Sequence, residues 1–168
     1  MRKLMIILVA AMMATMSAKA QEAGDFAIGA NATYNFKTES VAPGLKLQYN
    51  IFRMLRAEIT GDYWTKKDRT QSIDAFFNLH LLIHASNVFK IYPIAGIGYI
   101  NTKTDGLEYT IDGVNVHVPE KKRDNVMGNA GLGLQVNFSR HFAFGVEGKY
   151  QFKDDDQFCA SAGLIYIF

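Results

Sequence analysis

Charged residues recur at alternate positions of segments whose other alternate positions are apolar. Alternate residues of a β-strand share one face, so these charges are expected on a single face, opposite the apolar one. Counting along the segments places most of them at similar depth. Because an unpaired buried charge is unfavourable, opposite signs should interleave into one hydrogen-bonded network. The predicted network comprises Lys46, Arg56, Glu58, His80, Glu147 and Lys149.

Two functions are open to this predicted network. In the first, the side chains pair with one another and fill a narrow interior, which is a structural role. In the second, they line a polar channel as a gate or selectivity filter. Acyl-transfer chemistry would need a histidine beside a serine and a carboxylate, but Ser72 and Asp74 lie eight and six residues from His80, or about 20 Å and more along a strand. The four histidines and one cysteine have no metal-ligand spacing. We therefore expect no catalytic residues, metal or cofactor.

Eight amphipathic segments of about ten residues must position these side chains. Their apolar residues recur with a period of two, which predicts strands with one apolar face. The fifth segment is apolar on both faces and contains Pro93; we interpret Ile91, Ala95, Ile97 and Tyr99 as its outward apolar face. The links after the even segments are tight, whereas the links after the odd segments are longer or more polar, spanning residues 37–44, 65–71, 102–124 and 153–157.

The orientation of the apolar face decides between a soluble and a membrane protein. The opposite face is small or amide-rich over long stretches, as at Asn31 and Gly131, which suits the lumen of an eight-stranded barrel better than water. Aromatic residues lie at both ends of the apolar face, as expected at two membrane interfaces. These features predict an all-β, eight-stranded antiparallel up-and-down transmembrane β-barrel, and a soluble β-sandwich is the alternative.

The composition and the first residues agree with an exported single domain. The chain has 168 residues, 49% hydrophobic and 20% charged. Residues 1–20 combine a basic start, an apolar run and a small-x-small end, which predicts a cleaved signal peptide and a barrel domain over residues 21–168. Without that segment, 18 − 3 = 15 basic residues face 16 acidic ones. This balance gives no reason to expect a nucleic-acid partner.

The third long link contains a hairpin signal. An Asp-Gly pair separates two β-rich runs of about five residues, a pattern typical of a type I′ turn. The runs are too short to span a membrane, so we expect a protruding sheet whose edge could add a strand from a partner. Nearby basic residues could bind lipopolysaccharide phosphates. The predicted interaction hairpin is centred on Tyr109, Asp112, Gly113 and Val116.

The last strand carries the most specific resemblance. Together with the signal peptide and the eight strands, a terminal strand with Leu164, Tyr166 and Phe168 resembles the small outer-membrane barrels of the OmpX/OmpA transmembrane type. That resemblance implies recognition of this strand by the barrel-assembly machinery, a location in the outer membrane of a Gram-negative bacterium, contact with outer-membrane lipid and lipopolysaccharide, and an extracellular protein or surface ligand as partner.

The expected function is non-enzymatic. We expect a structural and surface-interaction role, by adhesion or partner binding, through the long outer loops. A narrow channel for ions or small solutes is the alternative, and a lipid A-modifying membrane enzyme is a third hypothesis.

Overall fold

The computed structural model describes residues 23–67, 70–86, 88–104, 107–111, 114–118, 121–152 and 156–168. The predicted signal peptide lies outside the described residues. No described helix is long and apolar enough to cross a membrane. The strands are β1 (Phe26–Asn35), β2 (Ser40–Phe52), β3 (Leu55–Lys67), β4 (Thr70–Leu81), β5 (Ile83–His84), β6 (Phe89–Thr104), β7 (Leu107–Ile111), β8 (Val114–Val118), β9 (Lys121–Asn137), β10 (Phe142–Phe152) and β11 (Gln157–Ile167).

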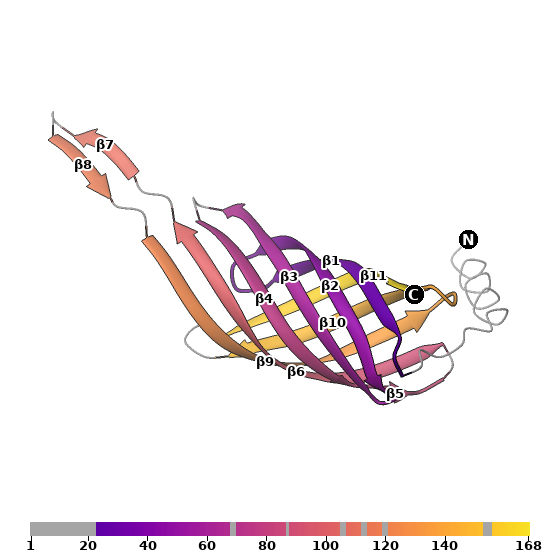
Figure 1. Ribbon diagram of the computed structural model, residues 1–168. Helices are drawn as coiled ribbons and strands as arrows, with labels where there is room; N and C mark the ends of the chain where they lie inside the picture. Colours follow the sequence, from indigo (N-terminus) through magenta and orange to yellow (C-terminus); the bar gives the residue numbers. More distant parts are fainter. Residues whose placement is uncertain are drawn as a thin grey trace.

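Eight long strands close into a barrel (Figure 1). Each pairs antiparallel with its neighbours in the order β4-β3-β2-β1-β11-β10-β9-β6, and a β4–β6 ladder joins the two ends. The two-residue β5 follows β4 and also pairs with β6. Strands β7 and β8 form a separate two-stranded sheet. The predicted eight-stranded up-and-down barrel is confirmed, and the hairpin does not enlarge it to ten strands.

Burial alternates along the strands with the period that the sequence predicts. In β1, every second residue is buried and the residues between are exposed. The exposed side chains are the apolar ones: Leu45 and Leu132 are 63% and 64% exposed. Most of the buried ones are polar, and Glu58 is fully buried. This inverts the distribution of a water-soluble protein and fits a barrel whose outer surface meets lipid.

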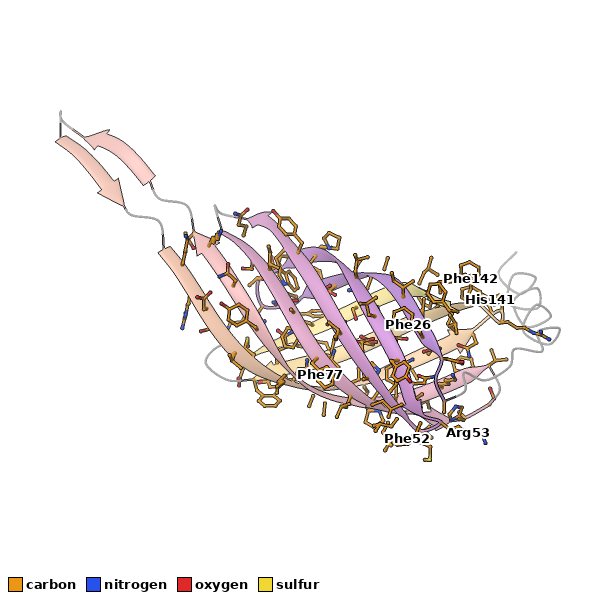
Figure 2. All side chains as sticks on the ribbon, viewed as in Figure 1. Phe26, Phe52, Arg53, Phe77, His141 and Phe142 are labelled. Carbon is orange, nitrogen blue, oxygen red and sulfur yellow. The ribbon has the colours of Figure 1, made fainter. Side chains whose placement is uncertain are left out.

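Aromatic side chains contact one another at both ends of the barrel. Near the chain end, Phe168 packs against Phe26 and Tyr166, with ring centroids 5.7 and 5.0 Å apart. At the opposite end, Phe36 packs against Tyr34 and Phe158, with centroids 4.9 and 5.4 Å apart. Figure 2 shows the Phe26 and Phe142 side chains at the end of the barrel away from β7 and β8. Two such belts are typical of rings at the two membrane interfaces.

The register of the fifth long strand, β6, agrees with the sequence interpretation. Ile91 and Ile97 are exposed, whereas the even-numbered Lys90, Tyr92 and Ile94 are buried in the lumen. Pro93 lies within β6 at a position paired with Leu132. The apolar character of both faces arises because the bulky Tyr92 and Ile94 fill lumen positions that are polar in other strands.

Three of the four links at the rim of β7 and β8 are shorter than predicted, although they are polar as the sequence indicated. Strand β2 already begins at Ser40, whose Cα pairs with Asn35, so only residues 36–39 separate it from β1. Likewise, residues 68–69 separate β3 from β4, and 153–156 separate β10 from β11. Polar residues in these segments continue the ladders, because a strand above the lipid or facing the lumen tolerates them. Only the β6–β9 link is long.

Candidate functional site

Six charged or titratable side chains from four strands meet inside the barrel. Strand β2 supplies Lys46, β3 supplies Arg56 and Glu58, β4 supplies His80, and β10 supplies Glu147 and Lys149. None is more than 5% exposed. The inward parity of each strand directs these residues to the lumen, and the barrel's closure brings strands distant in sequence face to face. We call this set the central cluster; its members are the six residues that the sequence singled out.

Glu147 is the anion with the most contacts in the central cluster. Its Oε1 accepts from Lys46 Nζ at 2.9 Å, and its Oε2 lies 3.2 Å from Lys149 Nζ. The hydroxyls of Tyr92 and Ser161 donate to the two oxygens at 3.1 and 3.3 Å. A carboxylate bridging two buried ammonium groups neutralises charges that would otherwise be very unfavourable in this interior.

Glu58 continues the alternation of charge. Lys46 Nζ lies 3.6 Å from its Oε2, so Lys149, Glu147, Lys46 and Glu58 form a chain of alternating sign. The amides of Gln48 and Asn78 also donate to Glu58, at 2.7 and 3.3 Å. These hydrogen bonds use the carboxylate's remaining acceptor capacity.

Arg56 is fully buried and fixes the state of His80. Its Nε and Nη2 lie 3.1 and 3.0 Å from His80 Nδ1, and its Nη1 donates to Gln135 and Gln48 at 2.6 and 3.2 Å. A guanidinium only donates, so Nδ1 must accept and the proton of neutral His80 sits on Nε2. Nε2 faces Glu58 Oε1 at 3.5 Å, too long for a good hydrogen bond.

Tyr92 closes the cluster on one side. Its ring stacks on His80 with centroids 4.8 Å apart, and the Arg56 Cζ lies 4.6 Å from its centroid. A ring against a guanidinium in a desolvated site is a favourable cation–π contact. Together with the ion pairs, this stack fills the lumen with side chains at the level of the central cluster.

Three potential metal ligands converge here, which the sequence spacing did not indicate. Atoms of Glu58, His80 and Glu147 lie within 4.8 Å of one another. They come from three strands, so no local motif records the grouping. Lys46 Nζ contacts both carboxylates, and a divalent cation would have to displace that ammonium. The arrangement therefore favours an internal ion-pair network.

A second pair of acids lies nearer the β7–β8 end of the lumen. Asp62 and Asp74 are Cα partners on β3 and β4, and both are buried. Asp62 accepts from Asn31 and Thr33 at 2.8 and 3.2 Å. Asp74 accepts from Trp64 Nε1 at 2.6 Å and from the Asp62 backbone at 3.2 Å. We call Asp62 and Asp74 the outer acid pair.

Sequence reasoning missed several neutral members of the lumen network. Gln48, Asn78 and Gln135 bind the central cluster directly, and Tyr92 stacks on it. All four lie at alternate strand positions that face the lumen, and this alternation could have identified them from the sequence. The pattern of charged residues alone does not reveal the amides that bridge them.

The structure separates the groups considered for acyl chemistry. Ser72 Oγ donates to Thr102 Oγ1 at 2.9 Å, whereas His80 contacts Arg56, Glu58 and Tyr92. Asp74 instead binds Trp64. These contacts provide no serine–histidine–acid arrangement from Ser72, Asp74 and His80.

For the predicted interaction hairpin, the structure describes the backbone pairing of its two strands. Residues Tyr109 and Val116 are Cα partners in the β7–β8 ladder. Asp112 and Gly113 lie outside the described residues. Figure 1 shows this hairpin beyond the ends of β6 and β9, well away from the barrel.

The residues of the predicted assembly signal lie on the outer face of β11 and just after it. Leu164, Tyr166 and Phe168 are 57%, 37% and 67% exposed. Strand β11 is the last long strand of the barrel, and it pairs with the first strand, β1, as well as with β10.

A closed barrel with an apolar outer face, two aromatic belts and a polar lumen defines an integral outer-membrane protein. Residues 6–168 match the model of the outer membrane protein beta-barrel domain family, and the chain belongs to this family. It is located in the outer membrane of a Gram-negative bacterium. No curated protein matches the chain by sequence.

Solved structures share the fold at low sequence identity. The N-terminal β-barrel domain of Pseudomonas aeruginosa OprF is 13% identical with a TM-score of 0.69, covering 88% of this chain and 100% of that one. OprG from the same organism is 14% identical with a TM-score of 0.64, covering 90% and 99%.

A third similar structure is Ail, the attachment invasion locus protein of Yersinia pestis, at 14% identity and a TM-score of 0.53, covering 87% of this chain and 99% of that one. Ail has also been solved in complex with the heparin analogue sucrose octasulfate.

Proposed function

We propose that this protein is a non-enzymatic outer-membrane barrel that presents the β6–β9 extension and the β7–β8 hairpin to a ligand at the cell surface. The observation that carries the proposal is the length of the β6–β9 ladder. It runs from the Phe89–Val136 pair to the Thr104–Lys121 pair, well beyond the roughly 9–11 residues that span a membrane.

The outer face of this extension is polar. Beyond Tyr99 in the aromatic belt, the outward positions of β6 are Asn101 and Lys103, and those of β9 are Asp124 and Lys122. Asn101 Nδ2 donates to Asp124 Oδ1 at 2.5 Å across the ladder. Such a surface lies outside the hydrocarbon layer, among lipid headgroups and water, and so the extension carries the hairpin away from the membrane.

The hairpin offers strand edges. Each of β7 and β8 pairs with the other in a two-stranded sheet, which leaves their outer edges available in the part of the chain that the structure describes. Backbone groups along such an edge can bind an extended segment of a partner by strand addition. The β-branched residues of the two runs favour that geometry.

The lumen supports a structural role over a channel. Arg56, Glu58 and His80 have no exposed surface, and Tyr92 is stacked among them. Passage of an ion would require several buried charge contacts to open together. The Ail likeness supports a surface role at the level of fold, because Ail is named for attachment and was solved with a sulfated ligand.

Recognition of β11 by the barrel-assembly machinery, through Leu164, Tyr166 and Phe168, is part of the same proposal. Their lipid-facing side chains on the closing strand support it.

Replacing residues 107–118 with a short Asn-Gly turn tests the proposed function. We expect cells displaying this variant to lose at least tenfold in adherence to immobilised collagen, mucin or heparin, whichever the parent binds. The removed hairpin contains no described lumen residue, so the heat-dependent gel shift of the folded barrel should persist.

The matched control replaces residues 153–155, in the β10–β11 link at the same rim, with Gly-Ser-Gly. This control should adhere like the parent. Equal adherence of the hairpin variant and the parent, with both barrels folded, would refute the role of the hairpin.

A further inference from the structure

A groove on the lipid-facing wall lies directly beneath a cationic pair. The groove has a volume of about 390 Å³ and is lined almost entirely by apolar atoms. Its walls include Ile59, Phe77, Ile97 and Tyr99, which lie on three neighbouring strands. Figure 2 shows the Phe77 side chain on this outer wall.

Small residues produce the hollow. Ala75 on β4 pairs with Gly61 on β3 and with Tyr99 on β6, so a methyl side chain lies next to a residue without a side chain at one level. Gly98, which also lines the groove, is covered by the Phe76 ring from the lumen side. Larger residues surround this level, and an elongated apolar depression results.

Two lysines face outward above the groove. Lys103 and Lys122 are Cα partners in the β6–β9 ladder, and both are exposed. Two ammonium groups at paired positions on one face concentrate positive charge, which attracts a phosphate. Lys103 is four residues beyond Tyr99 on the same strand, or about 13 Å. With Tyr99 in the aromatic belt, the lysines lie at the level of lipid headgroups.

We infer that this wall of the barrel binds lipid A, the phosphorylated and acylated part of lipopolysaccharide, with an acyl chain in the groove and a phosphate at Lys103 and Lys122. The groove lies in the hydrocarbon layer, so a lipid chain is its natural occupant. The lysines select a lipid whose headgroup carries concentrated negative charge. The site is separate from the hairpin of the proposed function.

The charge pattern differs on another part of the same rim. The β10–β11 link contains Asp154, Asp155 and Asp156, and Asp156 accepts from Tyr150 at 3.0 Å. The acidic Asp156 there disfavours phosphate, whereas the outward Asp124 beside the lysine pair accepts a hydrogen bond from Asn101. The lipid should therefore bind one wall of the barrel rather than coat it uniformly.

The test compares lipid enrichment around the full barrel in nanodiscs of phosphatidylcholine containing a small fraction of lipid A. Lipids retained by the purified complex are counted by native mass spectrometry. The parent should retain lipid A above its bulk fraction. Lys103→Gln with Lys122→Gln should reduce that enrichment, roughly fivefold for each lysine. Ala75→Phe, which fills the groove with a lipid-compatible ring, should reduce it separately.

The controls distinguish this site from general attraction and from the hairpin. Lys37→Gln, at an exposed cation in the β1–β2 turn, should retain lipid A like the parent, and so should the hairpin deletion. Dephosphorylated lipid A and phosphatidylglycerol should not be enriched. Parental enrichment in the double lysine variant, or equal enrichment of phosphatidylglycerol, would overturn the proposal.

Discussion

The central cluster and the outer acid pair occupy the same lumen, yet they stabilise carboxylates by different means. Glu147 contacts two ammonium groups, whereas the described hydrogen bonds to Asp62 and Asp74 come from amide, hydroxyl, indole and backbone donors. In the first region the charge of each member is needed by its neighbours. In the second, neutral groups make the hydrogen bonds, and Lys149 acts on the two acids only from a distance. The same isosteric change should therefore have unequal effects in the two regions.

Glu147→Gln should give the largest effect. The amide keeps the shape but leaves Lys46 and Lys149 without their shared anion, and breaking a buried pair typically costs about 3–5 kcal/mol. The measurement is urea unfolding in detergent micelles, followed by the fluorescence of Trp64, the single tryptophan. The unfolding midpoint should fall sharply.

A second substitution identifies charge imbalance as the cause. Glu147→Gln combined with Lys149→Met restores the balance, because Lys46 still lies 3.6 Å from Glu58. This double variant should regain much of the lost stability. A double variant no more stable than the single one would contradict the charge explanation.

Gly133→Ala should give an intermediate effect. A methyl group at this inward position of β9 would overlap the Tyr92 ring, which stacks on His80 and donates to Glu147. Overpacking of this kind typically costs about 1–3 kcal/mol. The same unfolding measurement applies. Gly145→Ala is the matched control, because its methyl group would make only ordinary contacts with Ile165 and Tyr92. If both variants unfold alike, Tyr92 does not constrain the cluster.

Much of the fold can be predicted from sequence, because the alternation of residues between the two faces of a strand is a local property. The alternation along residues such as Leu45, Lys46 and Leu47 assigns each to a face, whatever the partner strand. Strand ends are less predictable. Ser40 looks like part of a loop but pairs with Asn35, since polarity does not end a strand above the lipid.

The partners within the lumen could not be predicted in the same way. Lys46 on β2 meets Glu147 on β10, 101 residues away, and this depends on closure and register around the whole barrel. Counting along the strands could predict that the charged residues of the central cluster lie at a similar depth in the barrel. The position of Tyr92 against both His80 and Arg56 could not be predicted, because it depends on where β6 lies in the barrel wall.

Asp74→Asn should give the smallest effect. Asparagine retains one oxygen, which can still accept the hydrogen bond from Trp64 Nε1. The change also removes a negative charge next to Asp62. One hydrogen bond to the carboxylate is exchanged for relief of like-charge repulsion, so the free energy of unfolding should change by less than about 1 kcal/mol. Trp64 fluorescence measures the stability and also shows whether the indole contact persists.

The comparison between Asp74→Asn and Glu147→Gln tests the difference between the two regions directly. Both changes convert one buried acid to its amide without altering its shape, so a difference in stability reflects the neighbours. Neutral donors surround Asp74, whereas ammonium groups contact Glu147. If Asp74→Asn were as destabilising as Glu147→Gln, the carboxylate charge of the outer acid pair would be as necessary as that of the central cluster. A cation acting on Asp74 from beyond hydrogen-bond distance would then have to be included in the same network.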